Sequence, residues 1–307
     1  MIYPPYQILN PKQIFQMASR FPDVFRQRHA QSHKGTYGTL AVVGGAAGMS
    51  GAVVLAATAA MYQGCGKVWA GFNQSILPFA VIPERPEIML ATAENLCRHE
   101  DISAWVIGCG LGLQQDAQNI VTWALQHTQN QPLLLDADAL TLLARSQTDR
   151  ELAKQHGQLV LTPHPAEAAR LLHTASADIQ ANRIQSAKTI SQTFNAFTVL
   201  KGHQSLVATP DGRIYTNSSG NAGLATAGSG DVLSGMIGSL LAQGIDTQQA
   251  VQAGVWLHGA AADVLRDSQI GETGMLAGEI APAARWLRNR IADQSYRYGQ
   301  TAARLKV

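Results

Sequence analysis

Short apolar runs alternate with longer amphipathic segments along most of the chain, a pattern typical of buried strands followed by helices. The apolar runs predict strands at 39–43, 67–72, 104–107, 132–136, 158–161 and 197–200. Helical spacing predicts helices at 52–62, 116–127, 166–173 and 232–243, at about 178–195, 247–266 and 279–292, and one that begins at 137–140. The turn Pro210-Asp-Gly212 lies between 204–208 and 213–216 and predicts a hairpin. The segment 76–90, with three prolines, shows no clear pattern.

Buried strands that alternate with helices indicate an α/β fold, with a mostly parallel central sheet and helices on both faces. No internal repeat or break in composition marks a domain boundary. We therefore expect a single domain over residues 1–307, with a polar N-terminal lead at about 1–33 and a polar C-terminal tail at about 293–307. Within the lead, the spacing of Phe15, Met17, Phe21 and Phe25 predicts helical packing onto the body.

Composition and charge narrow the classes of protein. The 307 residues are 46% hydrophobic, enough for a large core, and the net charge of +2 is too mild to indicate nucleic-acid or membrane binding. The uncharged stretch from Gly35 to Gly66 is long enough to cross a membrane, but its glycine-rich middle splits it into a strand, a loop and a helix. Three cysteines without CxxC spacing predict reduced thiols. The N-terminus resembles no secretory signal, so we expect a cytoplasmic protein.

The segment from Asn217 to Asp231 is rich in glycine, serine and alanine and leads into the predicted helix 232–243. Such a loop offers unpaired backbone N–H groups and the positive end of a helix dipole, so it favours phosphate. A carboxylate repels a neighbouring anion and needs another role. Asp231 is therefore either a general base that takes a proton from a hydroxyl, or a helix N-cap. The local pattern leaves both interpretations open.

Other glycine, acid and histidine features directly follow predicted strands, at 44–51, 108–112, 136–138, 163–167 and 201–205. In open α/β sheets ligands bind outside the carboxyl ends of the strands, so we expect these loops to surround one site. The chain contains no G-x-x-x-x-G-K-[ST] loop, and its glycine loops lack the spacing of a dinucleotide-binding fingerprint. A nucleotide site here would use neither of these two common devices.

Several of these stretches carry a combined signature between about residues 33 and 260. They are His33-Lys-Gly-Thr-Tyr-Gly38, Gly44-Gly-Ala-Ala-Gly-Met-Ser-Gly-Ala52, Gly108-Cys-Gly-Leu-Gly112, Leu135-Asp-Ala-Asp-Ala-Leu140, Leu161-Thr-Pro-His-Pro-Ala-Glu167, Val199-Leu-Lys-Gly202 and the segment from Asn217 to Gly235. In this order they resemble the NAD(P)H-hydrate dehydratases of the ribokinase-like superfamily. The resemblance implies a stand-alone lyase that repairs (6S)-NADHX and (6S)-NADPHX, the hydrates of NADH and NADPH, at the expense of ADP.

The resemblance also implies roles for single residues. Asp231 would be the general base while the hydrate hydroxyl is phosphorylated, and phosphate would then be eliminated. The implied substrate contacts are Ala52, Gly110, His164 and Asp231. The implied adenine-nucleotide contacts are Lys201, Gly202, His203, Gln204, Ser205 and Gly230.

Structural interpretations stand beside these roles. Ala52 can begin a packed helix, Gly110 can permit a turn, and Lys201 can be a solvated charge at a strand end. His164, held between two prolines after a strand, is better explained by binding than by core packing. Asp136 and Asp138 either function or cap a helix, whereas structural roles are expected for His258 and Asp263.

Two positions depart from the family pattern. Ala166 stands where the family commonly has glycine. Related kinases carry an Asn-x-x-Glu motif associated with magnesium, and the comparable stretch here, His164-Pro-Ala-Glu167, keeps only the acid. Mg²⁺ is therefore expected from phosphoryl chemistry, with no ligands assigned.

Two other functions use the same features. A small-molecule kinase for a vitamin precursor or sugar would need the same loop and base, and a non-catalytic nucleotide sensor would need the loop alone. An intact Asp231 argues against the sensor, because a pure phosphate binder gains nothing from a nearby carboxylate. The donor is expected to be ADP, with ATP as the alternative. The alanine- and glycine-rich helices suit subunit packing, and we expect a homo-oligomer.

Overall fold

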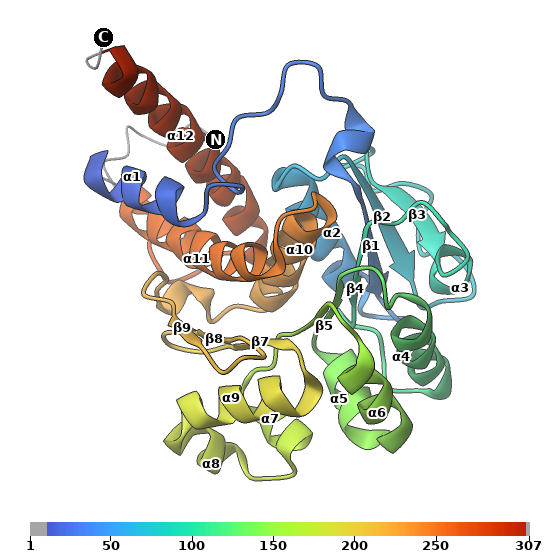
Figure 1. Cartoon of the computed structure of the whole chain (residues 1–307). Helices are drawn as coiled ribbons and strands as arrows, with labels where there is room; N and C mark the ends of the chain where they lie inside the picture. The colour runs from blue at the N-terminus through green and yellow to red at the C-terminus, as the bar shows by residue number, and fades with distance from the viewer. Residues whose placement is uncertain (1–10, 305–307) are drawn as a thin grey trace.

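A nine-stranded sheet runs through the chain, of which the computed structural model describes residues 11–304 (Figure 1). The strands are β1 Thr39–Gly44, β2 Lys67–Phe72, β3 Met89–Thr92, β4 Ala104–Ile107, β5 Leu133–Leu135, β6 Leu159–Leu161, β7 Phe197–Leu200, β8 Leu206–Ala208 and β9 Ile214–Thr216. Their order is β3-β2-β1-β4-β5-β6-β7-β8-β9. All pairs from β3 to β7 are parallel, and β8 and β9 add antiparallel pairs at one edge. The predicted α/β fold with a mostly parallel sheet is confirmed.

Helices form a layer on each face of the sheet (Figure 1). One layer contains α1 Pro11–Arg20, α2 Ser50–Tyr62, α10 Ser229–Ala242, α11 Thr247–Leu265 and α12 Ala277–Arg304. The other contains α3 Ala93–Leu96, α4 Gln115–His127, α5 Asp138–Arg145, α6 Gln147–Gln155, α7 Pro165–Leu172, α8 Ser176–Ala181 and α9 Arg183–Phe194. Short 3₁₀ helices occur at Lys34–Tyr37 and Ala222–Leu224, and a π-helical turn at Arg266–Ile270.

Alternating side chains of the strands supply two separate cores. In β1, Leu40 and Val42 point into one core, while Ala41 and Val43 point into the other. All four are fully buried, because successive side chains of a strand face opposite sides and helices cover both. This arrangement explains why the central strands read as continuous apolar runs.

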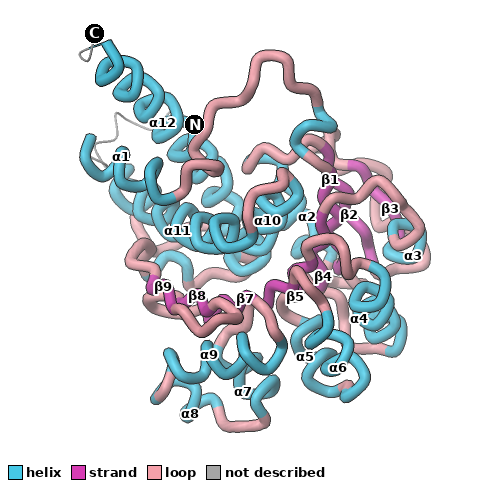
Figure 2. The backbone as a smooth tube through the Cα atoms, in the orientation of Figure 1, coloured by secondary structure: helices cyan, strands magenta, loops and turns pink. Residues whose placement is uncertain are grey.

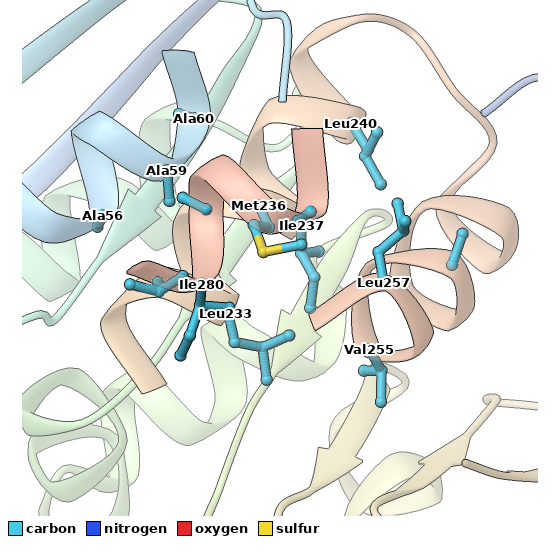
Figure 3. Close-up of a cluster of buried hydrophobic side chains, with 14 of the residues drawn as sticks. Ala56, Ala59, Ala60, Leu233, Met236, Ile237, Leu240, Val255, Leu257 and Ile280 are labelled. Carbon is cyan, nitrogen blue, oxygen red and sulfur yellow. The ribbon is translucent and has the colours of Figure 1, made fainter. Parts of the chain in front are cut away.

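The helices α2 and α10 pack closely along a seam of small residues. Ala56, Ala59 and Ala60 of α2 face Leu233 and Met236 of α10 (Figure 3). The seam has no spare room: a Cβ added to Gly235 would lie 2.0 Å from the carbonyl oxygen of Ala56. The two helices therefore approach almost backbone to backbone.

Three segments differ from the sequence-based expectations. The strand β3 and helix α3 follow the proline-containing segment, and their short, edge-of-sheet pattern gave no clear signal. The helix expected to begin at 137–140 is followed at once by a second helix, α6. In the N-terminal lead, Phe21 and Phe25 are buried, but Phe15 is 59% exposed. Residues 1–10 and 305–307 of the predicted lead and tail lie outside the described residues.

None of the helices in the described chain combines the length and the apolar character needed to span a membrane. The segment Gly35 to Gly66, which by length alone would cross one, forms β1, a loop and α2 as predicted.

Candidate active site

The loops that follow β1 and β4 are joined at the point where the strand order changes direction. The backbone N–H of Gly45 donates to the carbonyl of Cys109 (2.9 Å), and that of Ala46 donates to the carbonyl of Gly110 (2.7 Å). A crevice outside the carboxyl ends of the strands at such a switch point is where ligands bind in open α/β sheets. Gly110 has a φ of +60°, and a Cβ added there would lie 3.3 Å from the Cβ of Ala52. The structure thus brings Ala52 and Gly110 together.

The helix α10 begins beside the loop after β4, because Asp231 in its first turn accepts a hydrogen bond from the Cys109 thiol. Its N-cap is Gly228, with a φ of +87°, and no side chain caps the helix start. Asp231 is the third residue of the helix, so the N-cap interpretation of Asp231 is wrong. Because a helix start leaves its first N–H groups without intrahelical partners, the N–H groups of Gly230 and Asp231 have no partner within the helix.

A buried polar network connects the start of α10 to the ends of β5 and β7. The carboxylate of Asp136, which is 1% exposed, accepts from Lys201 Nζ at its Oδ1 (2.7 Å) and from Ser234 Oγ at its Oδ2 (2.7 Å). Lys201 Nζ also lies 3.9 Å from Oε2 of Glu167. A Cβ added to Gly230 would lie 3.5 Å from Lys201 Nζ, so the ammonium group faces the helix start.

The residue after Asp136 has an unusual backbone conformation. Ala137 has φ 49° and ψ −117°, a region that L-amino acids rarely adopt. Its N–H donates to Oδ1 of Asp136 (2.8 Å). Asp138 accepts the N–H of Gly112 at Oδ2 (2.8 Å) and lies in the first turn of α5, whose N-cap is Ala137. Neither aspartate is therefore an N-cap; both carboxylates fix loops at the carboxyl edge of the sheet.

His164 forms the N-terminal cap of α7. Its Nδ1 accepts the N–H groups of Ala166 (3.1 Å) and Glu167 (3.4 Å), and Oε2 of Glu167 accepts the N–H of His164 (2.7 Å). This reciprocal capping box orients the imidazole, which leaves Nε2 as the hydrogen-bearing nitrogen. Nε2 lies 3.3 Å from Oε1 of Glu167, and the side chain is 48% exposed, so the imidazole is held by the helix start and still reaches solvent.

The surroundings of Asp231 weaken its acidity. Burial and the negative charge of Asp136 raise the pKa of Asp231 to about 6, against the lowering effects of the Cys109 thiol and of Lys201. Cys109 is fully buried, which raises its pKa and keeps it a thiol that donates to Asp231. A carboxyl group with a pKa of about 6 is ionised at neutral pH and is a better proton acceptor than an ordinary aspartate.

The other titratable groups of the network have shifted pKa values as well. Burial raises the pKa of Glu167 to about 7, and the Lys201 charge opposes that rise. Burial alone would lower the pKa of Lys201, but the charges of Asp136 and Glu167 outweigh it and raise that pKa. Burial and the Lys201 charge lower the pKa of His164, so its imidazole is neutral. One ammonium group is thus surrounded by acids at the start of α10.

A cavity of about 700 Å³ adjoins the network on the side of β7. The loop from Gly202 to Ser205 lines it, together with the glycine-rich segment before α10 and residues of α11. Four of the expected nucleotide contacts, Gly202 to Ser205, therefore share one cavity. Lys201 and Gly230 do not line it; they lie beside Asp136 instead.

Residues of α11 hold the glycine-rich segment in place. Asp263 accepts the N–H of Gly220 (2.8 Å) and the side-chain amide of Asn221 (3.0 Å). His258 Nε2 bonds to the carbonyl of Ser229 (2.9 Å), and burial lowers the pKa of His258 to about 4. These contacts give His258 and Asp263 the structural role expected for them. Two partners were not found from the sequence, Ser234 and Cys109, because no local pattern relates them to Asp136 or Asp231.

Comparison with known proteins adds independent evidence. Residues 40–284 match the sequence model of the NAD(P)H-hydrate dehydratase family. A Neisseria meningitidis ADP-dependent (S)-NAD(P)H-hydrate dehydratase is 61% identical over 280 residues, which cover 91% of this chain and 95% of that protein.

Solved structures agree with the sequence relatives. A Bacillus subtilis ADP/ATP-dependent NAD(P)H-hydrate dehydratase, crystallised with ATP and Mg²⁺, superposes with a TM-score of 0.79 at 32% identity, over 92% of this chain and 97% of that one. A ribokinase-like superfamily protein from Enterococcus faecalis superposes with a TM-score of 0.75 at 25% identity, over 92% and 95% of the two chains. This chain belongs to the NAD(P)H-hydrate dehydratase family.

Proposed function

We propose that this protein is an ADP-dependent dehydratase that restores NADH and NADPH from their (6S)-hydrates. The observation that carries the proposal is the position of Asp231. This carboxyl group, with a pKa of about 6, lies in the first turn of α10, where it bonds to Cys109, the residue before Gly110, and feels the charges of Asp136 and Lys201. A base in that place serves a hydroxyl group on one side and a phosphoryl group on the other.

The first proposed step is phosphoryl transfer. Asp231 takes the proton of the hydrate hydroxyl, whose oxygen attacks the terminal phosphorus of ADP, and AMP leaves. The N–H groups at Gly230 and Asp231 and the ammonium of Lys201 stabilise the charge that develops on the transferring group. Lys201 suits this role better than adenine binding, because its ammonium faces the helix start and not the cavity.

The second proposed step is elimination. The lone pair of the ring nitrogen expels phosphate by breaking the carbon–oxygen bond, and loss of a proton from the neighbouring carbon restores the dihydropyridine. Phosphate leaves far more readily than hydroxide, which explains why a nucleotide is consumed to remove water. Ala52, Gly110 and His164 form the proposed wall for the hydrate, with the neutral imidazole as a hydrogen-bond donor through Nε2.

The proposed nucleotide site is the cavity lined by Gly202, His203, Gln204 and Ser205. Mg²⁺ is the expected companion of the nucleotide, and when bound it neutralises phosphate charge. Among the residues that the structure describes, no three His, Cys, Asp or Glu side chains gather into a metal site. We therefore assign the ion no protein ligands, and expect phosphate oxygens and water to hold it.

One experiment separates this function from its alternatives. Purified protein is incubated with hydrated NADH or NADPH, Mg²⁺, and either ADP or ATP. Dehydration predicts recovery of the reduced-nicotinamide absorbance with stoichiometric free phosphate, and a comparison of the two nucleotides identifies the donor. A stable phosphorylated alcohol with no recovered absorbance would instead indicate a small-molecule kinase, and nucleotide binding without turnover would indicate a sensor. The cytoplasmic location and the homo-oligomer stay predictions.

A further inference from the structure

A second cavity, of about 860 Å³, lies at the end of the sheet opposite to the candidate active site. Its lining residues come from the long segment between α1 and β1, from the ends of α2 and α10, and from α12. Figure 2 shows how the backbone of these segments runs. Gln63, which follows α2, and Gln243, which follows α10, both line it. Since α2 and α10 begin at the candidate active site and end here, the cavity has no part in the chemistry described above.

Basic side chains converge on this cavity. Arg26, Arg28, Arg285 and Arg288 line it, and so does His29. A Cβ added to Gly64 would lie 2.7 Å from Nη2 of Arg28 and 3.7 Å from Nη1 of Arg288, so these two guanidinium groups point to the same place.

Carboxylates neutralise only part of this positive charge. Arg26 Nη1 lies 3.9 Å from Oδ1 of Asp23, but within residues 11–304 no salt bridge involves Arg28, Arg285 or Arg288. The two acids that line the cavity also have other partners: Asp23 accepts from Gln249 (2.9 Å), and Asp293 accepts from Gln27 (3.3 Å).

The guanidinium groups also repel each other. Burial, and then the charges of Arg28 and Arg26, lower the pKa of Arg288 to about 10. An excess of like charges destabilises the folded protein, and a bound anion would relieve that repulsion.

A structural role accounts for part of this cluster. Arg288 donates to the carbonyls of Val24 (2.9 Å) and Gln63, and Arg28 donates to the carbonyl of Gly64. The bonds to Gln63 and Gly64 satisfy backbone acceptors that remain after the end of α2, and the bond to Val24 joins α12 to the segment after α1. Arg28 also lies over the ring of Tyr37, and Arg285 over the ring of Tyr62. However, each guanidinium has five N–H donors, and these contacts use fewer than that. They also leave the open volume between the arginines unexplained.

We propose that this cavity binds a small molecule that carries a phosphate or diphosphate group. Arginine is suited to phosphate, because its planar fork of donors matches two phosphate oxygens at once. The volume exceeds that of inorganic phosphate, so the natural ligand is a phosphorylated metabolite and not the free ion. The anion would be held by Arg26, Arg28 and Arg288.

Inorganic pyrophosphate is the probe for the test, with binding to the full-length protein measured by calorimetry in the absence of Mg²⁺. We expect Arg28→Gln and Arg26→Gln each to weaken binding roughly 10- to 100-fold, the loss of a charge-assisted hydrogen bond. The Arg26 side chain is 62% exposed, so Arg26→Gln should leave folding intact. This variant therefore still tests the proposal if Arg28→Gln fails to fold. The matched control is Arg98→Gln, an arginine that is 71% exposed and outside the cavity, which should bind pyrophosphate like the wild type.

A second control separates this cavity from the candidate active site. Lys201→Ala removes the ammonium at the start of α10 and should leave pyrophosphate binding at the arginine cavity unchanged. Three results would overturn the proposal: no binding of millimolar pyrophosphate by the wild type, equal binding by Arg26→Gln and wild type, or loss of binding in Lys201→Ala. None of these measurements depends on dehydratase turnover, so the two proposals fail separately.

Discussion

At the scale of single residues, the proton affinity of Asp231 is set by groups that lie far away in the sequence. Burial in the folded chain raises the pKa of Asp231 most, Asp136 raises it further, and Cys109 and Lys201 lower it. The sequence predicted Asp231, His164 and the 201–205 loop as parts of one site, because each follows a strand or precedes a helix in a recognisable motif. It did not predict the bond between Ser234 and Asp136, since the two residues are 98 positions apart and only the folded sheet joins them.

The first prediction concerns Asp231→Asn. Asparagine has the same shape but cannot accept the hydroxyl proton, so the rate of dehydration should fall by about 10²- to 10⁴-fold. Binding of ADP, measured by calorimetry, should stay within a few-fold of the wild type, because the loop and the cavity are unchanged. Near-normal turnover in this variant would remove Asp231 from the catalytic role.

The second prediction concerns the pH dependence. A protonated Asp231 cannot act as a base, so kcat/KM should fall as the pH drops through about 6. In Asp136→Asn a negative charge that raises the pKa of Asp231 is gone, so the acidic limb of the profile should move to lower pH. Profiles measured from pH 4.5 to 8 check this, with Asp116→Asn, an exposed carboxylate on α4, as the control. A uniform loss of activity with an unmoved limb would show that Asp136 only supports the fold.

At the scale of elements, most of the parallel strands and long helices were predictable because their apolar patterns are strong and local. The strand β3 was not, because it lies at the edge of the sheet and only Ala91 of its residues is buried, and α3 has only four residues. The close packing of α2 against α10 was not predictable from the sequence either, because alanine and glycine give a weak helical periodicity. Only the structure shows that Gly235 lies against the backbone of Ala56, where a larger side chain would not fit.

The third prediction tests that seam. Gly235→Ala places a methyl group 2.0 Å from the carbonyl oxygen of Ala56 and forces the helices apart. We expect a loss of about 2–3 kcal/mol in the free energy of unfolding, measured with chemical denaturant. The matched control is Gly157→Ala, where an added Cβ meets no atom within 4 Å, and its stability should change by less than about 0.5 kcal/mol. Equal stability of the two variants would mean that α2 and α10 can move apart without a measurable loss of stability.

At the scale of the whole molecule, the order of the strands assembles the site. Motifs spread from Gly44 to Asp231 meet because every parallel strand ends at the same edge, with β1 and β4 adjacent at the switch point. The convergence of the strand-end loops was predictable from that rule. The arginine cavity at the opposite end of the sheet was not, since its residues come from four distant segments without a motif.

The fourth prediction follows from binding to the folded state alone. ADP at about 100 times its Kd should stabilise the protein by about 2.7 kcal/mol, which corresponds to a rise in Tm of roughly 4–6 °C. Lys201→Ala should reduce this rise at the same ADP concentration, because the ammonium faces the proposed phosphoryl position. Lys154→Ala, at an exposed lysine of α6, is the control and should show the full rise. Scanning fluorimetry is sufficient for the comparison.

The conformation of Ala137 implies that conformational energy is stored beside the network. A residue with φ 49° and ψ −117° costs of order 1–3 kcal/mol, and here it is held by its own bond to the Asp136 carboxylate. Glycine adopts this region freely, so Ala137→Gly should raise the Tm of a protein that otherwise keeps its structure. If the strain keeps Asp136 turned toward Lys201, the same variant should turn over more slowly. A higher Tm would then accompany slower turnover, and the strained backbone at Ala137 would serve catalysis at the expense of stability.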